Sequence, residues 1–329
     1  MPHSVSEALS AEPVREPAGV PPTRVCLLTA VRNEAKQAER FLRELYQVCK
    51  EHGLLARTHL VIIDDYSIDA TRRIIADTAA MLEELSVEVI ELPSNRGNQS
   101  AMAHGLRALA AQGGAGHLLT FDADGEDDLT QLPRLVRMLD EEPDRMVFVY
   151  RDGRRERWLL RAFYAAYRLA YRLLTGQRLI PCNMMAIPGT MVSAIAASPL
   201  LPLHFSYPPL RLGLPYRAIA MPKRQRYGGQ SSQNVALLIQ HGLIGLTIFY
   251  EQVVARLILL SVGVVAVTGL AALWIVAVRV FSPHVLPTGL TTAVFVSLIG
   301  FGFLSIVLLV VFCLASAVFR LLMEQSRPE

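Results

Sequence analysis

The first half of the chain alternates between two hydrophobic periods. Short apolar or β-branched runs of strand type occur at residues 24–30, 59–64, 87–92, 117–121 and 145–150. The segments between them carry apolar residues at helical spacing, for example at 70–85 and 100–112. Strands that alternate with helices predict a mostly parallel sheet covered on both faces. We therefore expect an α/β domain over residues 23–150.

Two long uncharged stretches near the C-terminus follow a different pattern. They cover residues 257–278 and 291–319, and the first would span roughly 33 Å as a helix, against a hydrocarbon core of about 30 Å. A buried core helix can also be apolar, but two stretches of this length favour membrane helices. We expect two transmembrane helices at about 257–278 and 291–319, with both chain ends on one side of the membrane.

The remaining residues complete the expected domain organisation. Residues 1–22 are rich in Pro, Ser, Glu and Ala and contain no apolar segment of signal-peptide type, so we expect a disordered tail and no secretion signal. After the core at 23–150, we expect a further segment at 151–233 that contains an interfacial helix. Residues 234–329 are expected to hold a juxtamembrane helix and the two spans. We then expect the α/β domain and both termini to be cytoplasmic.

Overall composition changes this picture little. The 329 residues carry a net charge of +3, with arginines crowded between residues 151 and 178. That segment is expected to face an anionic partner. The four cysteines, Cys26, Cys49, Cys182 and Cys313, show no paired or metal-type spacing, which is typical of core residues in a reducing compartment. No GxGxxG follows the first strand, which argues against a dinucleotide-binding domain.

An acidic cluster follows the fourth predicted strand. Five carboxylates fall within seven positions, at Asp122, Asp124, Glu126, Asp127 and Asp128. Two ionised carboxylates about 4 Å apart repel by roughly 4 kcal/mol at an effective dielectric of 20, so such a cluster takes up protons or binds a cation. Oxygen ligands at the end of a strand favour Mg²⁺ or Mn²⁺ with a diphosphate. A solvated acidic turn is the alternative.

Three further predicted strands end in polar residues. These are Asn33 and Glu34 after the first, Asp64 and Asp65 after the second, and Asn95 and Gly97 after the third. A carboxylate at a strand end can accept hydrogen bonds from ribose hydroxyls or a base N–H. Ser67 and Asp69 fit equally well as caps of the following helix.

Taken in order and spacing, these pieces resemble the nucleotide-sugar glycosyltransferases of family 2. The matching pieces are RNE at 32–34, DDYSIDAT at 64–71, NRGNQSAMAHG at 95–105 and DADGED at 122–127. The later residues resemble the polyprenyl-phosphate branch of that family, which includes dolichol-phosphate mannose synthase and bacterial membrane-anchored enzymes. There the family has an Arg-rich segment followed by a Phe-Tyr helix, and this chain has YRDGRRERWLLRAFYAAYR at 150–168. Later the family has R-x-x-G-x-S-K, and this chain has RYGGQSS at 226–232.

The resemblance implies a GT-A fold and an inverting transfer of a sugar from a nucleotide-sugar to a polyprenyl phosphate. Asp65 and Glu34 would help to hold the nucleotide, and Asp122 and Asp124 would hold Mg²⁺ or Mn²⁺. Asp127 occupies the position of a catalytic base in many members. The last motif supplies Arg226 and Ser231 to the substrates and has Ser232 where the family has lysine.

An anionic acceptor must be held close to an anionic donor, which requires fixed cations. Arg151, Arg154 and Arg226 are our candidates, with Arg161 as a further one, since a planar guanidinium binds phosphate through a fork. Residues 151–233 are therefore expected to form the acceptor-side segment. A solvated or lipid-facing basic surface is the alternative. In residues 158–174, tyrosines and arginines at helical spacing indicate a helix in the lipid headgroup region, although a core helix with a polar face has similar spacing.

We therefore expect an integral membrane protein of the bacterial inner membrane. The expected partners are a nucleotide-sugar, a polyprenyl phosphate and the membrane, with no nucleic acid and with self-association left open. Two other functions are compatible with the sequence. One is transfer to a hydroxyl acceptor, which would need a true base at Asp127. The other is a catalytically inactive sugar-nucleotide-binding protein, suggested by Ser232 and by the stretch PCNMM at 181–185.

Overall fold

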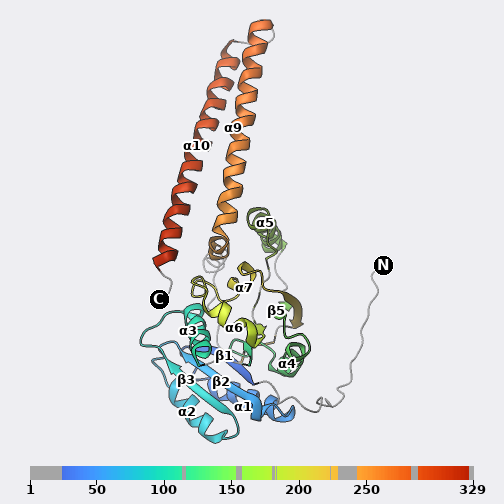
Figure 1. Cartoon of the computed structure of the whole chain (residues 1–329), viewed down its shortest axis with the longest axis vertical. Helices are drawn as coiled ribbons and strands as arrows, with labels where there is room; N and C mark the ends of the chain where they lie inside the picture. The colour runs from blue at the N-terminus through green and yellow to red at the C-terminus, as the bar shows by residue number, and fades with distance from the viewer. Residues whose placement is uncertain are drawn as a thin grey trace, which may run out of the picture.

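The computed structural model describes residues 24–112, 116–152, 158–179, 182, 184–222, 224–228, 243–282 and 288–325. An α/β domain forms one end of the molecule, and a long hairpin of two helices projects from it (Figure 1). The expected fold class, an α/β domain with a mostly parallel sheet and two apolar C-terminal helices, is confirmed.

One sheet of seven strands organises the domain, in the order β3-β2-β1-β4-β6-β5-β7. The strands are β1 (Val25–Val31), β2 (Thr58–Asp64), β3 (Ser86–Glu91), β4 (His117–Thr120), β5 (Met146–Asp152), β6 (Met184–Ile187) and β7 (Tyr216–Pro222). All pairings are parallel except those of β6, which runs antiparallel to β4 and to β5. The sheet thus continues past residue 150, where the sequence predicted the end of the core.

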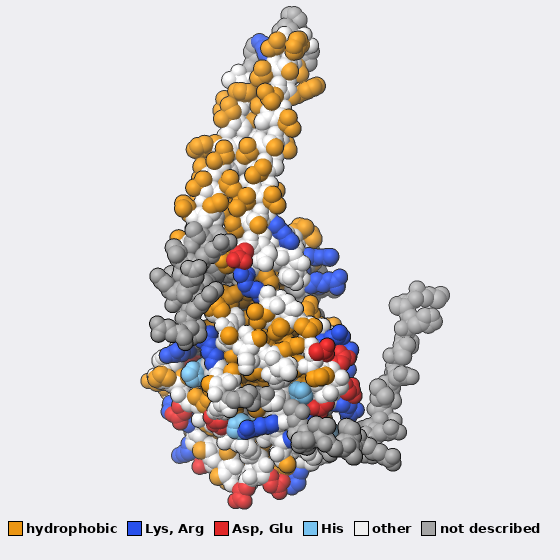
Figure 2. Space-filling view, in the orientation of Figure 1, with side chains coloured by type: hydrophobic (Ala, Val, Ile, Leu, Met, Phe, Trp, Pro, Cys, Tyr) orange, Lys and Arg blue, Asp and Glu red, His pale blue; other side chains and the backbone are white. Residues whose placement is uncertain are grey.

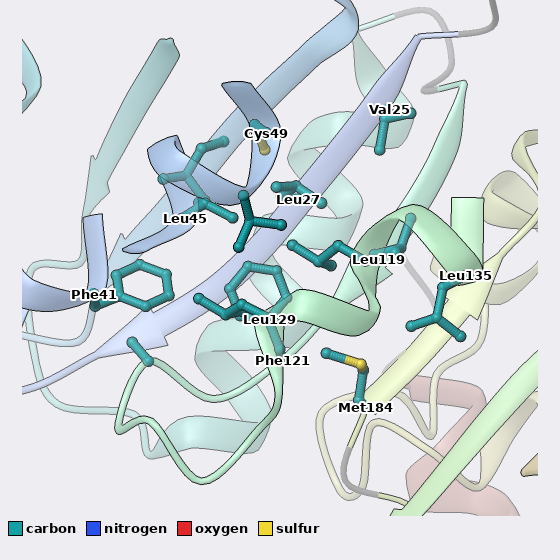
Figure 3. Close-up of a cluster of buried hydrophobic side chains, with 14 of the residues drawn as sticks. Val25, Leu27, Phe41, Leu45, Cys49, Leu119, Phe121, Leu129, Leu135 and Met184 are labelled. Atoms are coloured by element: carbon teal, nitrogen blue, oxygen red, sulfur yellow. The ribbon is translucent and has the colours of Figure 1, made fainter. Parts of the chain in front are cut away.

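Helices cover both faces of this sheet because the central strands are apolar on both sides. In β1, Val25 and Leu27 join one buried cluster with α1 (Ala38–Glu51), α2 (Thr71–Met81) and α4 (Leu132–Glu141). Cys26 and Leu28 point into the opposite cluster, with α3 (Asn98–Ala111) and α6 (Gly189–Ala196). Figure 3 shows the first cluster, in which Phe41 of α1 packs against Phe121 with ring centroids 5.8 Å apart.

The projecting hairpin consists of α9 (Tyr250–Phe281) and α10 (Thr288–Gln325). Candidate membrane spans cover Tyr250–Phe281 and Thr292–Ala315, which include most of the two predicted stretches. Hydrophobic side chains cover the visible surface of the hairpin, whereas charged groups gather on the α/β domain (Figure 2). Trp274 is 71% exposed and Phe303 is 68% exposed. An apolar surface of this size is typical of contact with lipid.

The foot of the hairpin is tied to the domain through α5 (Trp158–Thr175). Arg256 of α9 donates hydrogen bonds to the backbone oxygens of Leu173 (2.8 Å) and Arg172 (3.3 Å), near the C-terminal end of α5. Tyr171 is fully buried and its ring lies 6.3 Å from that of Phe249, just before α9. These contacts join the hairpin to the same buried cluster that supports β1 and α3.

The described part of α5 shows which side faces outward. The sequence suggested that its tyrosines lie at the lipid interface, but Tyr171 is buried and Tyr167 is half-buried against it. Tyr164, Arg168, Leu169, Arg172 and Leu173 are the exposed residues with a charged or large side chain in the described part of this helix. The outward face therefore combines guanidinium groups with leucines and Tyr164. Tyr167 and Tyr171, four residues apart, lie toward the protein interior, whereas Tyr164 is 37% exposed.

Candidate active site

The carboxyl ends of the parallel strands collect most of the polar residues expected at the site. The turns after β1, β2 and β3 carry Asn33, Asp65 and Asn95, and the acidic loop (residues 122–128) follows β4. Because β1 lies between β2 and β4 in the sheet, these turns are neighbours in space. The segment of residues 224–228, which comes after β7, reaches the same edge through hydrogen bonds to the acidic loop.

The turns after β1 and β2 are bonded to each other. Asn33, which has a φ of +55°, donates its N–H to Ser67 Oγ at 3.0 Å. Its side-chain oxygen accepts from the N–H of Ile68 at 2.9 Å. Asp69 accepts from the N–H of Thr71 at the start of α2 and from the N–H of Ala35. Asp69 therefore bonds both the helix start, as a capping residue does, and the neighbouring turn, whereas Ser67 serves the turn.

The carboxylates of Asp64 and Asp65 accept hydrogen bonds from backbone N–H groups, and Asp64 also pairs with an arginine. Asp64 is completely buried, and its Oδ2 accepts from the N–H of Ser67 and pairs with Arg72 Nε, both at 3.0 Å. Asp65 accepts from the N–H groups of Arg96 (2.7 Å) and Gly97 (2.9 Å). It thereby fixes the turn before α3, where Gly97 adopts a φ of +79° that favours glycine. Direct contact of these carboxylates with a nucleotide stays a prediction.

The same turn contains Asn95. Its side-chain oxygen accepts from the N–H of Gly97 at 3.1 Å, and both residues are exposed. Asp65 and Asn95 thus share one backbone N–H between them. Their common effect is to shape an exposed turn at the N-terminus of α3, where a helix dipole favours negative charge.

The acidic loop folds back on itself through its own carboxylates. Asp127 accepts a hydrogen bond from the N–H of Asp122 at 2.8 Å, and Asp124 Oδ1 accepts from the N–H of Glu126 at 2.9 Å. Asp128 accepts from the N–H of Thr130, at the start of a short 3-10 turn (Leu129–Gln131). Asp124 and Asp127 are 9% and 5% exposed, so this is no fully solvated acidic turn.

Arg226 reaches this loop from residues 224–228. Its Nη2 donates to Asp124 Oδ2 at 2.6 Å, and its Nε lies 3.6 Å from Glu126 Oε1. Asp124 and Arg226 are 102 residues apart in sequence, and both were expected at the site, but local sequence patterns do not predict their direct contact. The structure thus brings together two of the expected site residues, Asp124 and Arg226.

Glu34 lies close to the same charges. Burial raises the pKa of Glu34, the negative charge of Asp124 raises it further, and Arg226 acts in the opposite direction. The backbone oxygen of Glu34 accepts from the N–H groups of Gln37 and Ala38, both at 2.9 Å, just where α1 begins. The backbone of Glu34 is therefore fixed at the start of α1. Its carboxyl group lies within electrostatic reach of Asp124 and Arg226.

Sequence reasoning missed several residues around the acidic loop. Tyr227 and Glu44 are hydrogen-bonded to each other at 2.8 Å, and Arg224 pairs with Glu44 and with Asp128. Burial raises the pKa of the Cys182 thiol well above its ordinary range, and the nearby charges of Asp127 and Asp122 act in the same direction. The signal for Tyr227 was its place inside the RYGGQSS motif, but nothing in the sequence pointed to Glu44 of α1.

Some expected site residues fall outside what the structure describes. Arg154 and Ser231 lie outside the described residues, as does Ser232. The backbone of Arg151 belongs to β5, opposite Met221 of β7, and its side chain is outside the described part. The roles expected for these residues stay predictions.

The acidic loop has the donor set of a site for a hard divalent ion. Asp122 and Asp124 offer only oxygen ligands, which Mg²⁺ and Mn²⁺ prefer. Within the described residues there is no group of three or more His, Cys, Asp or Glu side chains that could hold a metal ion. A pair of carboxylates nevertheless fits Mg²⁺, which commonly keeps several waters and takes further ligands from substrate phosphates.

A separate cavity of about 490 Å³ lies at the opposite ends of the strands. Its lining includes Arg57 and Thr58 before and at the start of β2, together with Arg24 and Ser86. Arg57 is already paired with Asp140, at 3.2 Å. This cavity lies at the amino ends of the strands, whereas ligands of open α/β sheets bind at the carboxyl ends, so we assign the site to the acidic loop.

Comparisons with known proteins identify the family of this chain. Residues 26–194 match the family model described as glycosyl transferase family 2. Over 175 residues the chain is 27% identical to an undecaprenyl-phosphate 4-deoxy-4-formamido-L-arabinose transferase of Pseudomonas fluorescens. That match covers 53% of this chain and 49% of the relative, so the chain spans about half the length of this curated relative.

Two solved structures are also similar to this chain. One is the mannosyltransferase PcManGT of Pyrobaculum calidifontis in complex with GDP-Man and Mn²⁺, at 16% identity, a TM-score of 0.45 and coverage of 88% of this chain and 91% of that one. The other is mannosyl-3-phosphoglycerate synthase of Rubrobacter xylanophilus, at 15% identity, a TM-score of 0.46 and coverage of 70% and 74%.

The family match contains nearly all of β1, all of β2 to β6, and the whole acidic loop, whereas residues 224–228 lie outside it. It spans 169 of the 329 residues, from 26 to 194, which is just over half of the chain. The chain belongs to glycosyltransferase family 2.

Proposed function

We propose that this protein is an inverting glycosyltransferase that moves a sugar from a nucleotide-sugar donor to a polyprenyl phosphate at the cytoplasmic face of a membrane. Family membership supports the reaction class, and the Pseudomonas relative is named as a transferase for undecaprenyl phosphate. The two apolar helices support a membrane-bound acceptor. The expected location is the bacterial inner membrane, with both chain ends cytoplasmic.

The contact between Arg226 and Asp124 is the observation that carries the proposal. It joins a candidate phosphate-binding cation to a candidate metal-binding carboxylate at 2.6 Å. A transfer between two anions needs both groups within a few ångströms, because the donor diphosphate and the acceptor phosphate repel each other. A neutral hydroxyl acceptor would not need this guanidinium for its own binding.

Asp122 and Asp124 are the residues that would hold Mg²⁺ or Mn²⁺. Such an ion, when bound, supplies positive charge to the leaving nucleoside diphosphate. The turns that carry Glu34, Asp65 and Asn95 would bind the nucleotide around it. The exposed N-terminus of α3 lies beside them and favours the negative charge of a phosphate.

The acceptor phosphate attacks the anomeric carbon of the sugar while the bond from that carbon to the diphosphate oxygen breaks. This single displacement inverts the configuration at the carbon. A phosphate monoester has a second pKa near 6, so at pH 7 the acceptor is largely a dianion and needs no general base. Asp127 would then position Asp122, because its carboxylate accepts a hydrogen bond from the N–H of Asp122. Arg226, Arg151 and Arg154 would hold the dianion, with Ser231 as a further contact.

Lipid analysis tests this proposal directly. Membranes that contain the full chain are incubated with a panel of nucleotide sugars, and lipid extracts are analysed by mass spectrometry. We expect a polyprenyl phosphate whose mass has increased by one sugar residue, formed with one donor of the panel. Membranes with the Asp124→Asn variant should lack it. Sugar found only on hydroxyl-bearing lipids or glycans would contradict the proposed acceptor.

A further inference from the structure

Residues 224–228 lie along the acidic loop like a short latch. The N–H of Arg224 donates to the backbone oxygen of Glu126 at 3.2 Å, and the N–H of Tyr227 donates to the backbone oxygen of Asp124 at 3.0 Å. We call these five residues the latch. Both of its backbone hydrogen bonds end on the loop that carries the candidate metal ligands.

Tyr227 is the residue that fixes the latch. Gly125 has a φ of +85°, and a Cβ at this glycine would come within 2.7 Å of the Tyr227 ring, so the ring lies directly on the loop backbone. The Tyr227 hydroxyl donates to Glu44 Oε2 at 2.8 Å, and the Arg40 guanidinium lies 4.5 Å from the ring centroid. Glu44 and Arg40 belong to α1, so the ring is held between that helix and the loop.

Two more contacts connect the latch to α1. Arg224 pairs with Glu44, which therefore bonds two residues of the latch. At the other end, Gln37 Nε2 donates to the backbone oxygen of Gly228 at 3.0 Å. The latch is thus bonded at three of its five positions to α1 or to Gln37, which immediately precedes α1, and Arg226 lies in the middle of the latch.

This arrangement gives Asp124 a positive partner before any metal binds. Its Oδ2 accepts from Arg226, and its Oδ1 accepts from the N–H of Glu126. A divalent ion that binds Asp124 must approach the same carboxylate as the guanidinium, and two cations at that distance repel each other. Metal binding and the Arg226 contact therefore oppose each other.

We propose that Arg226 is the resident counter-ion of Asp124, positioned by Tyr227 and Glu44, and that the incoming metal with its donor displaces it toward the acceptor phosphate. The last step rests on the function proposed above. Displacement couples the two substrates, because binding of the metal-donor complex sets free the guanidinium that the acceptor needs. Tyr227 and Glu44 are positioning residues, since they act through Arg226.

Mn²⁺ affinity of the full chain in detergent, without nucleotide or lipid, tests the competition. Free Mn²⁺ is measured by electron paramagnetic resonance during a titration. Arg226→Ala should bind Mn²⁺ about tenfold more tightly than the native chain, because one competing positive charge is gone. Arg226→Lys keeps the charge and should stay close to the native affinity. Equal or weaker Mn²⁺ binding by Arg226→Ala would overturn the proposal.

Arg217→Ala is the matched control for this titration. It removes the same charge at an exposed position. Arg217, near the start of β7, pairs with Glu142, just after α4, at 2.6 Å. Its Mn²⁺ affinity should equal that of the native chain. A tightening equal to that of Arg226→Ala would mean that net charge, and no local competition, governs Mn²⁺ binding, and the proposal would fail.

A double-mutant cycle tests the positioning role. Tyr227→Phe removes the hydroxyl that bonds Glu44, and Glu44→Gln removes the charge that pairs with Arg224. Each should tighten Mn²⁺ binding less than Arg226→Ala does, and neither should add an effect in the Arg226→Ala background. Effects that persist in that background would show that these residues act on the site without Arg226.

These outcomes are separate from those of the transfer reaction. If the acceptor proves to be a hydroxyl, the proposed function fails while the Mn²⁺ results for the Arg226 variants still stand. If Arg226→Ala leaves Mn²⁺ affinity unchanged while polyprenyl phosphate is glycosylated, the counter-ion proposal fails and the function holds.

Discussion

Asp124 accepts hydrogen bonds on both carboxylate oxygens, one from a backbone N–H and one from Arg226. At the scale of single residues, this shows how a nearly buried carboxylate stays compatible with four further carboxylates in the same loop. The backbone and the guanidinium offset part of the mutual repulsion. A divalent ion would offset it further, so the site is built for positive charge.

The first prediction concerns Asp124 as a metal ligand. Asp124→Asn keeps the shape and removes the charge, so turnover should fall by about 10² to 10³, corresponding to several kcal/mol of lost charge stabilisation. The native enzyme should lose activity in EDTA and recover it with Mg²⁺ or Mn²⁺. Transfer rates of purified protein measure both effects.

Asp128→Asn is the control within the same loop. It removes an equal charge from a residue that accepts from Thr130 and lies 3.6 Å from Arg224. Its turnover should stay within about tenfold of the native rate, because replacing a residue beside a metal site lowers activity less than replacing a metal ligand. A native enzyme that is fully active in EDTA would contradict the metal site.

The second prediction is a pH dependence at His117. Burial lowers the pKa of His117 below its ordinary value of 6.5, Asp140 acts in the opposite direction, and Arg57 acts with burial. Below pH 6.5 the unfolded chain takes up a proton that the folded chain resists. The stability associated with the neutral ring is therefore present above pH 6.5 and is lost as pH falls through the folded pKa.

Thermal unfolding of the native protein and of His117→Gln, in detergent from pH 8 to pH 5, measures this effect. The native midpoint should fall more steeply than that of the variant, because glutamine does not titrate. Parallel curves would show that His117 does not contribute to the pH dependence.

The sequence located most of the site residues that lie on strand ends and missed those that lie on helix α1. Asn33, Asp65 and Asp124 follow buried strands, so the periodicity of the chain placed them at one edge of the sheet. Glu44 is an ordinary polar position of an amphipathic helix, and its partner Tyr227 is 183 residues away. Local patterns contain no information on such a distant pair.

At the scale of elements, the first five strands were predicted within about two residues, whereas β6 and β7 were missed. Apolar runs of β1 and β2 are buried on both faces, which gives a clear signal. By contrast, β6 has only four residues and β7 ends in a proline. Both also come after the position where the sheet seemed complete, and β6 runs antiparallel.

The third prediction concerns the junction of α5 with the hairpin. Arg256→Ala removes the hydrogen bonds from α9 to the last turn of α5, which should cost about 1 kcal/mol. For a chain of this size the unfolding midpoint should fall by about 2–4 °C. Thermal unfolding in detergent measures the shift.

Arg73→Ala, which removes an exposed guanidinium from α2, is the control and should leave the midpoint unchanged. A midpoint for Arg256→Ala equal to that of the native protein would mean that the other contacts of the junction, such as those of Tyr171 with Phe249 and of Arg211 with Glu251, hold it without Arg256.

At the scale of the whole molecule, the hairpin returns α10 toward the α/β domain (Figure 1). α9 leaves the domain at Tyr250, and α10 ends at Gln325 near the level of the domain. The described chain therefore begins and ends on the same side of the apolar hairpin. Arg256 lies near the domain end of α9, and Arg279 lies near the far end.

The fourth prediction follows from this geometry. Reporter fusions placed before residue 1 and after residue 329 should both report the cytoplasm. A fusion in the connector near residue 284 should report the other side, because α9 is long enough to cross. Ends that report different sides would contradict the hairpin as a pair of spans.

The most direct test of the proposed function is the choice of acceptor. Turnover is measured with polyprenyl phosphate and with the neutral polyprenol for the native chain, Asp127→Asn and Arg226→Ala. With an ionised phosphate acceptor, Asp127→Asn should slow the reaction modestly, Arg226→Ala should weaken acceptor binding strongly, and activity should fall as pH drops below about 6.

A hydroxyl acceptor reverses this order, because loss of a general base typically costs about 10² to 10⁴ in rate. Our account predicts transfer to polyprenyl phosphate alone, with the larger loss in Arg226→Ala. Transfer to the neutral alcohol, with Asp127→Asn inactive and Arg226→Ala near the native rate, would contradict it.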